Sequence, residues 1–481
     1  MNVVLISTYE LGHQPFGLAS PAAWLKAAGA AVTCFDLAVS HLERDVIAEA
    51  DLIAFYVPMH TATRIAVQLI PRIQAINPNA HLCAYGLYAP MNADYLRSLG
   101  VTTILGGEFE EGLVAVYEQL AASVRGAAAG NEAISSTATE IASPAFDSAA
   151  LRSGRLATTV PPMISLARQK FITPDRSGLS HLSKYAYLDR ADGCKKVVGY
   201  TETTRGCKHL CRHCPIVPVY NGQFRVVPSE VVLDDIEQQV EAGAGHITFG
   251  DPDFFNGPGH TLPIVEKLHQ LWPSLTYDVT IKIEHLLKYA RWLPVLRDTG
   301  CLFITSAVEA VDDRILDVLD KHHTRADFGR AVTALNEQGL AFNPTFVAFS
   351  PWISLAGYRD LLQTIAELEL VDNVAPVQYA IRLLIPAGSK LLDRSDVQQL
   401  IGSFDQAALA YPWQHPDARV DRLAAEVLKV VTAAQAADLS RGEIFDRVWE
   451  AAGTALGEDR PGPRSDRVSK PIPHLSESWY C

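Results

Sequence analysis

The first 120 residues alternate short apolar runs with amphipathic segments. The runs are continuously apolar, which is typical of parallel strands buried on both faces. Five such runs predict strands at Val3–Ser7, Val32–Asp36, Asp51–Pro58, His81–Tyr85 and Val101–Leu105. Between the third and fourth runs, His60–Ile76 has the periodicity of a helix with one apolar face. The pattern predicts a doubly wound α/β domain over residues 1–120, with a ligand crevice at the carboxyl ends of its strands.

The pattern changes at residue 121. Residues 121–160 are rich in Ala, Ser, Thr and Gly and contain few large apolar residues. Such a segment buries little apolar area, so we expect a flexible linker.

Strand and helix patterns alternate again over residues 161–392. Six strands are predicted, at Lys196–Thr203, His246–Gly250, Tyr277–Ile283, Leu302–Val308, Ala341–Phe349 and Pro376–Ile385. Six βα units form a partial (β/α)6 barrel, in which chemistry is expected at the strand carboxyl ends. Residues 393–457 are alanine-rich and predicted helical, covering the open side of the barrel, and residues 458–481 form a Pro-rich tail.

Composition narrows the class of protein. Apolar residues make up 48% of the 481 residues, as in a soluble globular protein, and no apolar run approaches the length of a membrane span. The N-terminus has no basic region followed by a cleavage site, so a cytoplasmic location is expected. The net charge of −13 makes a nucleic-acid partner unlikely.

Three of the eight cysteines, Cys207, Cys211 and Cys214, are clustered with Cys-x3-Cys-x2-Cys spacing. Three thiolates this close in sequence can converge on one metal centre. A [4Fe-4S] cluster with three cysteine ligands keeps one iron open to a small molecule. The alternative is a structural zinc site completed by His209 or His213. Zinc usually takes two separated ligand pairs, and no second pair follows in the sequence, so the cluster is favoured.

Polar residues follow the predicted strands, where the ligand of a partial barrel would lie. Gly250, Asp251 and Asp253 follow the second strand, Lys282 and Glu284 end the third, and Glu309 ends the fourth. A carboxylate such as Asp251 pairs well with an ammonium group when water is excluded. Asp253 is a candidate catalytic residue facing the substrate. The alternative for Asp253 is a cap on the following loop, and for the others a solvated loop charge or a structural ion pair.

The cysteine spacing and the preceding Thr204-Arg205-Gly206 resemble the signature of the radical SAM superfamily. The resemblance implies that the open iron takes the amino and carboxylate groups of S-adenosylmethionine (SAM). It implies that Gly250 and Asp251 bind the SAM amino group, and that Lys282, Glu284 and Glu309 meet the ribose and the methionine carboxylate. His213 replaces the usual aromatic residue before the third cysteine. An electron donor such as flavodoxin or ferredoxin is also implied.

Placed before this signature, residues 1–120 resemble a cobalamin-binding, Rossmann-like domain. The resemblance rests on the segment Pro15–Pro21 and the helix to Gly29, and it implies cobalamin as a further cofactor. The Asp-x-His-x-x-Gly motif is absent, because no Asp stands two residues before His13. Cobalamin is therefore expected without a protein histidine on cobalt. The turn at Gly106-Gly107-Glu108 is either a nucleotide-binding turn or a tight βα turn, and a domain without any cofactor is the alternative.

The last residues, Trp479-Tyr480-Cys481, resemble the end of a radical SAM family named for its Cys-Sec-Ala-Glu-Pro or Cys-Cys-Ala-Glu-Pro tail. The resemblance suggests that Cys481 is catalytic and that the chain continues through selenocysteine. A selenol would be a reactive nucleophile or ligand near the substrate. The alternative is a chain that ends in a free cysteine.

Together these features predict a radical SAM enzyme that modifies, and with cobalamin methylates, a small molecule or peptide. A methylthiotransferase acting on tRNA or protein is one alternative. Such enzymes carry a second cluster on three N-terminal cysteines, whereas the N-terminal domain has only Cys34 and Cys83. A cobalamin or metal sensor with an inert barrel is the other alternative.

Overall fold

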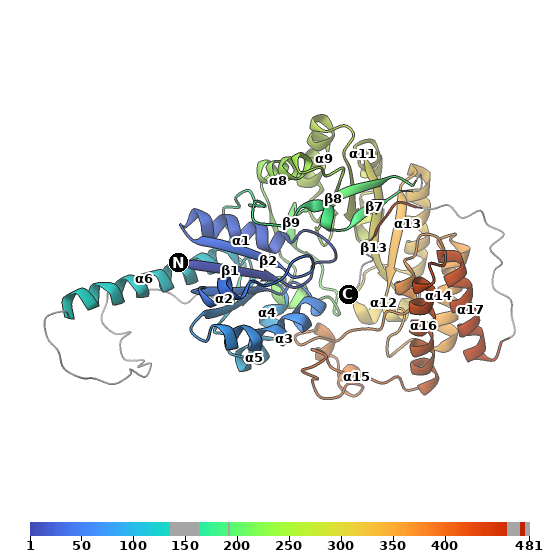
Figure 1. Cartoon of the computed structure of the whole chain (residues 1–481). Helices are drawn as coiled ribbons and strands as arrows, with labels where there is room; N and C mark the ends of the chain where they lie inside the picture. The colour runs from blue at the N-terminus through green and yellow to red at the C-terminus, as the bar shows by residue number, and fades with distance from the viewer. Residues whose placement is uncertain (135–162, 191–192, 459–471, 477–481) are drawn as a thin grey trace.

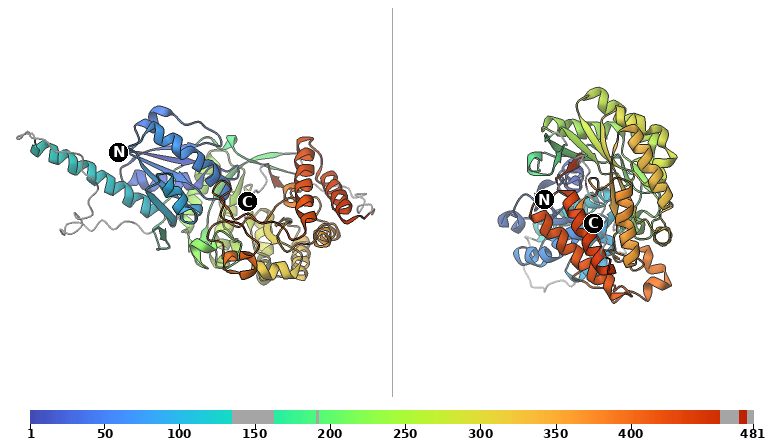
Figure 2. Two further views of the ribbon diagram at one scale, coloured as in Figure 1. Left: turned by 90° about the horizontal axis from the view of Figure 1, so that it is seen from below. Right: turned by 90° about the vertical axis from the view of Figure 1, so that its right-hand side faces the viewer.

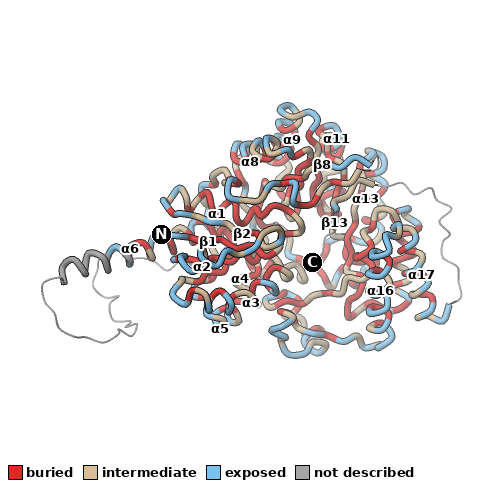
Figure 3. The backbone as a smooth tube through the Cα atoms, viewed as in Figure 1, coloured by how far each residue is buried: buried red, intermediate tan, exposed pale blue. Residues whose placement is uncertain are grey.

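A computed structural model describes residues 1–134, 163–190, 193–458 and 472–476. The described residues form two large sheets and one two-stranded sheet, and helices follow at the C-terminal side (Figure 1). Figure 2 shows the first sheet and the C-terminal helices at opposite ends of the second sheet. The strands at the centre of both sheets are mostly buried (Figure 3). Among the described residues, no helix has the length and apolar character needed to cross a membrane.

The first sheet is parallel throughout, with strand order β2-β1-β3-β4-β5-β6. Its strands are β1 (Asn2–Ser7), β2 (Ala31–Asp36), β3 (Leu52–Tyr56), β4 (His81–Tyr85), β5 (Thr103–Gly107) and β6 (Ile164–Ser165). Its helices are α1 (Phe16–Ala27), α2 (Arg44–Ala48), α3 (His60–Ile76), α4 (Tyr88–Met91), α5 (Ala93–Ser98) and α6 (Glu110–Ile134). The order of the first five strands confirms the doubly wound fold.

Alternating residues of these strands supply two apolar cores, one on each face of the sheet. Val4, Ile6 and Ile53 pack with Ile70 and Ile73 of α3. Val3, Leu5 and Leu52 face the other way and pack with residues of α1 and α6, including Leu18, Leu25 and Leu113. Burial on both faces explains why these strands are continuously apolar in the sequence.

Two local expectations about the segment after the first domain need correction. The residues from 121 to 134 belong to α6 rather than to a flexible linker. Alanine is the strongest helix former, so an alanine-rich stretch can extend a helix although it buries little area. Ile164 and Ser165 pair with Gly106 and Gly107 and add a sixth strand to the first sheet. The rest of the predicted linker lies outside the described residues.

The second sheet has the order β14-β13-β12-β11-β8-β7-β15. Five parallel strands correspond to predicted strands: β8 (Lys195–Thr201), β11 (His246–Phe249), β12 (Thr276–Thr280), β13 (Cys301–Glu309) and β14 (Ala341–Phe346). Antiparallel β7 (Tyr187–Asp189) and β15 (His474–Leu475) extend the edge beside β8. The covering helices are α8 (Ser229–Glu241), α9 (Pro258–Leu271), α10 (Ile283–Lys288), α11 (Leu293–Asp298), α12 (Asp313–Leu319), α13 (Arg325–Gln338) and α14 (Leu355–Glu367).

The sixth predicted strand is largely absent. Its first residues form a 3₁₀ helix, Pro376–Tyr379, and only an isolated bridge joins Phe349 to Arg382. The Gln378 side chain accepts a hydrogen bond from the backbone N–H of Phe346 at 2.9 Å. This N–H at the end of β14 is therefore satisfied by a side chain instead of a neighbouring strand.

The C-terminal helices are α15 (Ser395–Gln398), α16 (Ala418–Ala436) and α17 (Arg441–Leu456). Ser440 and Glu443 form a capping box that fixes the start of α17. Arg359 of α14 holds this helix by donating to the Trp449 carbonyl at 2.8 Å and lying over the Trp449 ring. These helices confirm the predicted helical region.

The two sheets meet around the buried guanidinium of Arg205, in β9 (Thr204–Gly206). Its nitrogens lie 2.7 Å from a Glu110 oxygen, 3.4 Å from Glu108 and 2.9 Å from Glu202. The rings of Phe16, Phe109 and Phe171 surround the group at 5.1–5.5 Å. One cation thus joins two carboxylates of the first domain to the loop that carries the cysteines.

Replacing Arg205 by Met should destabilise the protein strongly, because several buried carboxylates would lose their cation. We expect a loss of about 3–5 kcal/mol in the free energy of unfolding, measured by denaturant titration. Arg447→Met on the exposed side of α17 is the matched control. Adding Glu110→Gln to Arg205→Met should recover part of the loss. A loss below about 1 kcal/mol would contradict this account, because that is the size of an exposed ion pair.

Candidate functional site

The loop that carries Cys207, Cys211 and Cys214 follows β8 and β9 at the carboxyl end of the second sheet. β9 pairs antiparallel with β10 (Phe224–Val226), so the loop starts from a short hairpin. Gly206 is required at its entrance. Gly206 has a φ of +78°, and a Cβ there would lie 2.3 Å from the Tyr220 ring. The glycine of Thr-Arg-Gly is therefore also explained by the local backbone conformation and packing, besides the resemblance of the motif to a signature.

Hydrogen bonds from the barrel fix this loop at several points. Asn256 accepts from the Lys208 N–H at 3.3 Å and donates to the Gly206 carbonyl at 3.3 Å. Arg212 donates to the carbonyls of Asp317 and Val318, both at 2.9 Å. These carbonyls lie in the last turn of α12, where a cation is favoured. The loop is thereby ordered by protein contacts on both sides.

The three thiols are close enough to interact electrostatically with one another. Among the described residues, however, they do not form a group whose ligand atoms all lie within 4.8 Å of one another. A tetrahedral zinc ion with Zn–S bonds of about 2.3 Å would bring its sulfurs to roughly 3.8 Å of each other. The three sulfurs therefore lie farther apart in this structure than the sulfurs bound to one zinc ion would.

The protonation of the thiols also depends on a metal centre. Burial raises the pKa of Cys207 to about 11 and that of Cys214 to about 12. Both thiols are therefore protonated at neutral pH without a metal. Binding of a [4Fe-4S] cluster would release these protons, since thiolates are its ligands.

Asp251 is buried and fully engaged by the strand that leads to the cluster loop. It accepts from the Thr203 N–H at 2.9 Å and from the hydroxyls of Thr203 and Thr204 at 2.5 and 2.6 Å. These bonds hold the backbone just before Arg205. Its predicted contact with the SAM amino group stays a prediction, and its structural contacts were not anticipated from the sequence.

Gly250 is required by packing. A Cβ at Gly250 would lie 1.8 Å from the Tyr200 hydroxyl oxygen, so a side chain here would displace that ring. The Tyr200 ring packs 5.0 Å from the ring of His13, which belongs to the first domain. The predicted cofactor-binding role of Gly250 stays a prediction.

Asp253 contacts two histidines and caps the following turn. Its Oδ1 accepts from the Phe255 N–H at 3.2 Å, which confirms the capping alternative. Its Oδ2 lies 3.1 Å from His209 Nε2 and 2.5 Å from His285 Nδ1. Burial opposes ionisation, but the two histidines hold the pKa of Asp253 below its usual value. Asp253 thus ties the cysteine loop, through His209, to α10.

Lys282 and Glu284 extend this cluster of polar residues. Lys282 Nζ lies 3.4 Å from a Glu284 oxygen, and that oxygen lies 3.6 Å from His209 Nδ1. The ligand atoms of His209, Asp253 and His285 all lie within 4.8 Å of one another, in a partly to fully buried position. His285 could have been found in the sequence, because it directly follows the polar end of the third strand.

Glu309 has an unusual backbone and two basic partners. Its φ is +68°, in the left-handed region, and the register between β13 and β14 shifts next to it. Its Oε1 lies 3.1 Å from His213 Nε2 and 3.3 Å from Lys321 Nζ. Burial opposes ionisation, but Lys321 and His213 lower the pKa of Glu309 to about 2. A strained residue at a bulge that aims a carboxylate at the cluster loop is typical of a functional position.

The structure thus brings most of the predicted site residues to one end of the second sheet. His213 meets Glu309 there, while a cofactor-binding role of His213, which stands in place of the usual aromatic residue, stays a prediction. Cys481 lies outside the described residues, so its predicted catalytic role stays a prediction. Asn256, Lys321 and Arg205 were missed, because each acts through partners distant in the sequence.

Comparisons with known proteins agree with this geometry. Residues 201–348 match the sequence model of the Radical SAM superfamily, so the chain contains a radical SAM domain. A [4Fe-4S] cluster and SAM are the cofactors that this domain implies. The chain is 24% identical over 188 residues to the anaerobic magnesium-protoporphyrin IX monomethyl ester cyclase of Rubrivivax gelatinosus. That alignment covers 39% of this chain and 32% of the cyclase, about a third of the relative's length.

Two solved structures share the fold over a larger part of the chain. The cobalamin-dependent SAM radical enzyme OxsB, with aqua-cobalamin bound, has a TM-score of 0.60 at 13% identity, over 90% of this chain and 67% of OxsB. The radical SAM methyltransferase TsrM from Kitasatospora setae has a TM-score of 0.55 at 15% identity, over 76% of this chain and 70% of TsrM. These similarities confirm the predicted α/β fold class.

The cysteine ligands can be tested by metal content. After anaerobic reconstitution, the wild type should hold about four irons and four sulfides per chain. Alanine at Cys207, Cys211 or Cys214 should abolish the cluster and its visible absorption. Cys194→Ala is the control, because this exposed cysteine lies outside the loop. One zinc per chain without sulfide would favour the alternative metal site.

Glu309 should make stability depend on pH. Its pKa is depressed in the folded state, so its stabilising contribution is present above the usual glutamate pKa and is lost as the pH falls toward about 2. Between about pH 6 and about pH 3.5, the wild type should lose about 1.4 kcal/mol more unfolding free energy than Glu309→Gln. Glu450→Gln, at an exposed site on α17, is the control and should retain the wild-type slope. Equal slopes in the wild type and Glu309→Gln would contradict the assigned ion pairs.

Proposed function

We propose that the protein is a radical SAM enzyme that reductively cleaves SAM to methionine and a 5′-deoxyadenosyl radical. The radical abstracts hydrogen from a small molecule or peptide, which is then modified. The observation that carries the proposal is the ordered loop with Cys207, Cys211 and Cys214, inside a segment that matches the Radical SAM superfamily. The cluster would supply one electron to SAM. The surrounding residues would orient SAM and exclude water.

The surroundings of the loop support this assignment. Lys282 and Glu309 lie where strands end beside the thiols, and Lys321, after α12, lies next to Glu309. SAM carries an ammonium and a carboxylate, so a rim of both charges suits it. A sensor with an inert barrel would have no need for the strained carboxylate at Glu309.

We further propose cobalamin as a second cofactor and methyl transfer as the reaction. The first sheet has the order expected of a domain that binds ligands at its strand carboxyl ends. Buried polar atoms at those ends lack a hydrogen-bond partner among the described residues: Ser7 Oγ, Glu10 Oε2 and Asp36 Oδ2. The structure of OxsB with aqua-cobalamin shares this arrangement of domains. These orphaned atoms fit a polar ligand.

The turn at Gly106 and Gly107 gives weaker support for cobalamin binding than the unpaired polar atoms do. A Cβ at Gly106 would lie 2.2 Å from Pro90 Cγ, and one at Gly107 would lie 2.2 Å from the Ser165 carbonyl oxygen. Close packing therefore explains why glycine stands at both positions, as expected for a tight βα turn. A methylthiotransferase remains the alternative reaction, and the low cysteine content of the first domain speaks against its second cluster.

The finer resemblance of Trp479-Tyr480-Cys481 to the selenocysteine-type tail stays a proposal that rests on sequence alone. It is tested by the codon that follows Cys481, where UGA would support it and UAA or UAG would contradict it. A cytoplasmic location and an electron donor of the flavodoxin or ferredoxin type are likewise proposals.

Cofactor content and SAM cleavage test the function together. Protein produced anaerobically with cobalamin and reconstituted with iron and sulfide should contain about one cobalamin per chain. With a strong reductant it should form 5′-deoxyadenosine from SAM, and Cys207→Ala should form none. No 5′-deoxyadenosine from the reconstituted wild type would contradict the radical SAM reaction. Cleavage without bound cobalamin would contradict only the cobalamin proposal.

A further inference from the structure

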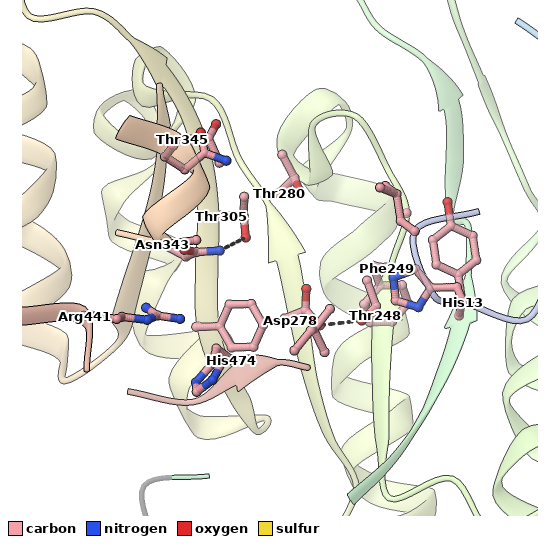
Figure 4. A pocket seen from close by; sticks show the side chains of 17 residues that line it. His13, Thr248, Phe249, Asp278, Thr280, Thr305, Asn343, Thr345, Arg441 and His474 are labelled. Atoms are coloured by element: carbon pink, nitrogen blue, oxygen red, sulfur yellow. Dashed lines mark hydrogen bonds between the residues drawn. The ribbon is translucent and has the colours of Figure 1, made fainter. Parts of the chain in front are cut away.

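A cavity of ≈ 810 Å³, counted with its open mouth, lies inside the second sheet (Figure 4). We call it the lumen cavity. Its wall is formed by inward-facing residues of β8, β11, β12, β13 and β14, together with Leu11 and His13 of the first domain and His474 and Leu475 of β15. Gly250 lines it, one residue before Asp251, whereas no residue of the cysteine loop does. The lumen cavity is therefore distinct from the cluster site and adjoins it.

Two wall residues carry side chains of opposite charge type: the acidic Asp278 and the basic Arg441. The other titratable groups are neutral. Burial lowers the pKa of His13 to about 4 and also lowers that of His474, and it raises the pKa of Tyr200 well above its usual value. The lumen cavity therefore has one positive and one negative wall group.

Arg441 has unused capacity to bind an anion. It donates one hydrogen bond, from Nη1 to the carbonyl oxygen of Asp372 at 2.8 Å. Within the described parts of the chain it forms no ion pair. Burial lowers the pKa of Arg441 more than neighbouring Tyr379 and Asp372 raise it. A carboxylate at its remaining N–H groups would offset this unfavourable desolvation.

Asp278 has a free oxygen on the other side of the cavity. Its Oδ1 accepts from the Thr248 hydroxyl at 2.7 Å and lies 2.9 Å from His246 Nε2. Its Oδ2 accepts no hydrogen bond from any residue that the structure describes. An ammonium group of a ligand would complete the bonding of this carboxylate.

Neutral polar side chains line the wall between the two charges. In Figure 4, Thr305, Asn343 and Thr345 extend along it, and Asn343 Nδ2 donates to the Thr305 hydroxyl at 3.2 Å. Arg441 and His474 lie on one side of the view, while Thr248 and His13 lie on the other, beyond Asp278. Apolar side chains, among them Leu11, Phe303 and Ala375, also line the cavity. A ligand that matches this wall has an uncharged body and opposite charges at its two ends.

We propose that the lumen cavity is the substrate site and that it takes an elongated zwitterion, such as an ω-amino acid or a short unblocked peptide. The carboxylate of the ligand pairs with Arg441 and its ammonium with Asp278. The proposal adds a substrate class to the proposed function. The description of the lumen cavity as a substrate site rests on that function. The charge pattern of the wall stands independently of the reaction.

Binding of simple probes tests the substrate class without turnover. Reconstituted protein, without reductant and with S-adenosylhomocysteine at saturating concentration to fill the SAM position, is titrated by ligand-observed NMR. The probes are the zwitterion 5-aminopentanoate, the anion pentanoate and the cation pentylamine. The zwitterion should bind most tightly. Arg441→Met should weaken its binding about 10- to 100-fold, the range of a lost charge-assisted contact, and should leave pentylamine binding unchanged.

Further variants separate the charge effect from misfolding. Asp278→Asn, which keeps the side-chain shape, should weaken binding of 5-aminopentanoate and pentylamine and spare pentanoate. Arg441→Lys should retain part of the zwitterion affinity, because it keeps the charge and loses the planar fork. Arg447→Met, on the exposed face of the same helix, should bind all probes as the wild type does.

Equal binding of the three probes, no binding of 5-aminopentanoate, or no effect of Arg441→Met would overturn the proposal. The outcome is separate from that of the proposed function. Probe binding in a protein that fails to cleave SAM would contradict the radical SAM reaction alone. SAM cleavage without zwitterion binding would contradict the substrate class alone.

Discussion

The buried ion pairs of Arg205 are the constraint on which the rest of the structure depends. Of its partners, Glu110 begins α6, the last helix of the first domain, and Glu108 lies two residues before it. The third partner, Glu202, precedes the cysteine loop. Burial raises the pKa of Glu202 to about 7 in spite of the nearby guanidinium. Such an arrangement is stable only while the cation stays in place, because an unpaired buried charge is costly.

The position of Arg205 makes the cluster loop depend on both domains. Asp251 holds Thr203 and Thr204 from the barrel side, and the next residue, Arg205, is held from the first domain. Gly206 and Cys207 follow directly. Cys207, the first proposed cluster ligand, therefore follows a backbone segment that is fixed by two sheets far apart in the sequence. A first domain that merely tethered a cofactor would not need this contact.

The sequence was sufficient to predict features that depend on neighbouring residues only. Continuously apolar strands, such as Val3–Ser7, and the cysteine spacing each carry their own signal. The polar strand ends also predicted correctly that Asp253, Lys282 and Glu284 gather beside the loop. The pairing of carboxylates with basic side chains was not predictable. Glu309, for example, contacts His213, which lies 96 positions away in the sequence.

The wrong predictions have both non-local and local causes. A sixth strand was expected at Pro376–Ile385, yet Gln378 satisfies the end of β14 through its side chain. The alanine-rich segment after residue 120 was expected to be a linker, because a composition that buries little area does not reveal whether a helix continues. The partners of Arg205 lie 97 and 95 positions away in Glu108 and Glu110, beyond the reach of any periodicity.

Residues of the first domain form part of the wall of the lumen cavity, the proposed substrate site. Tyr200 lines the lumen cavity, and its hydroxyl occupies the space that a side chain at Gly250 would take. His13 packs against the Tyr200 ring and Phe16 contacts it edge-on at 6.3 Å. The loop after β1 therefore closes one wall of the cavity. The first domain shapes the lumen cavity through these contacts whether or not it also carries cobalamin, so retention of the domain does not by itself require that cofactor.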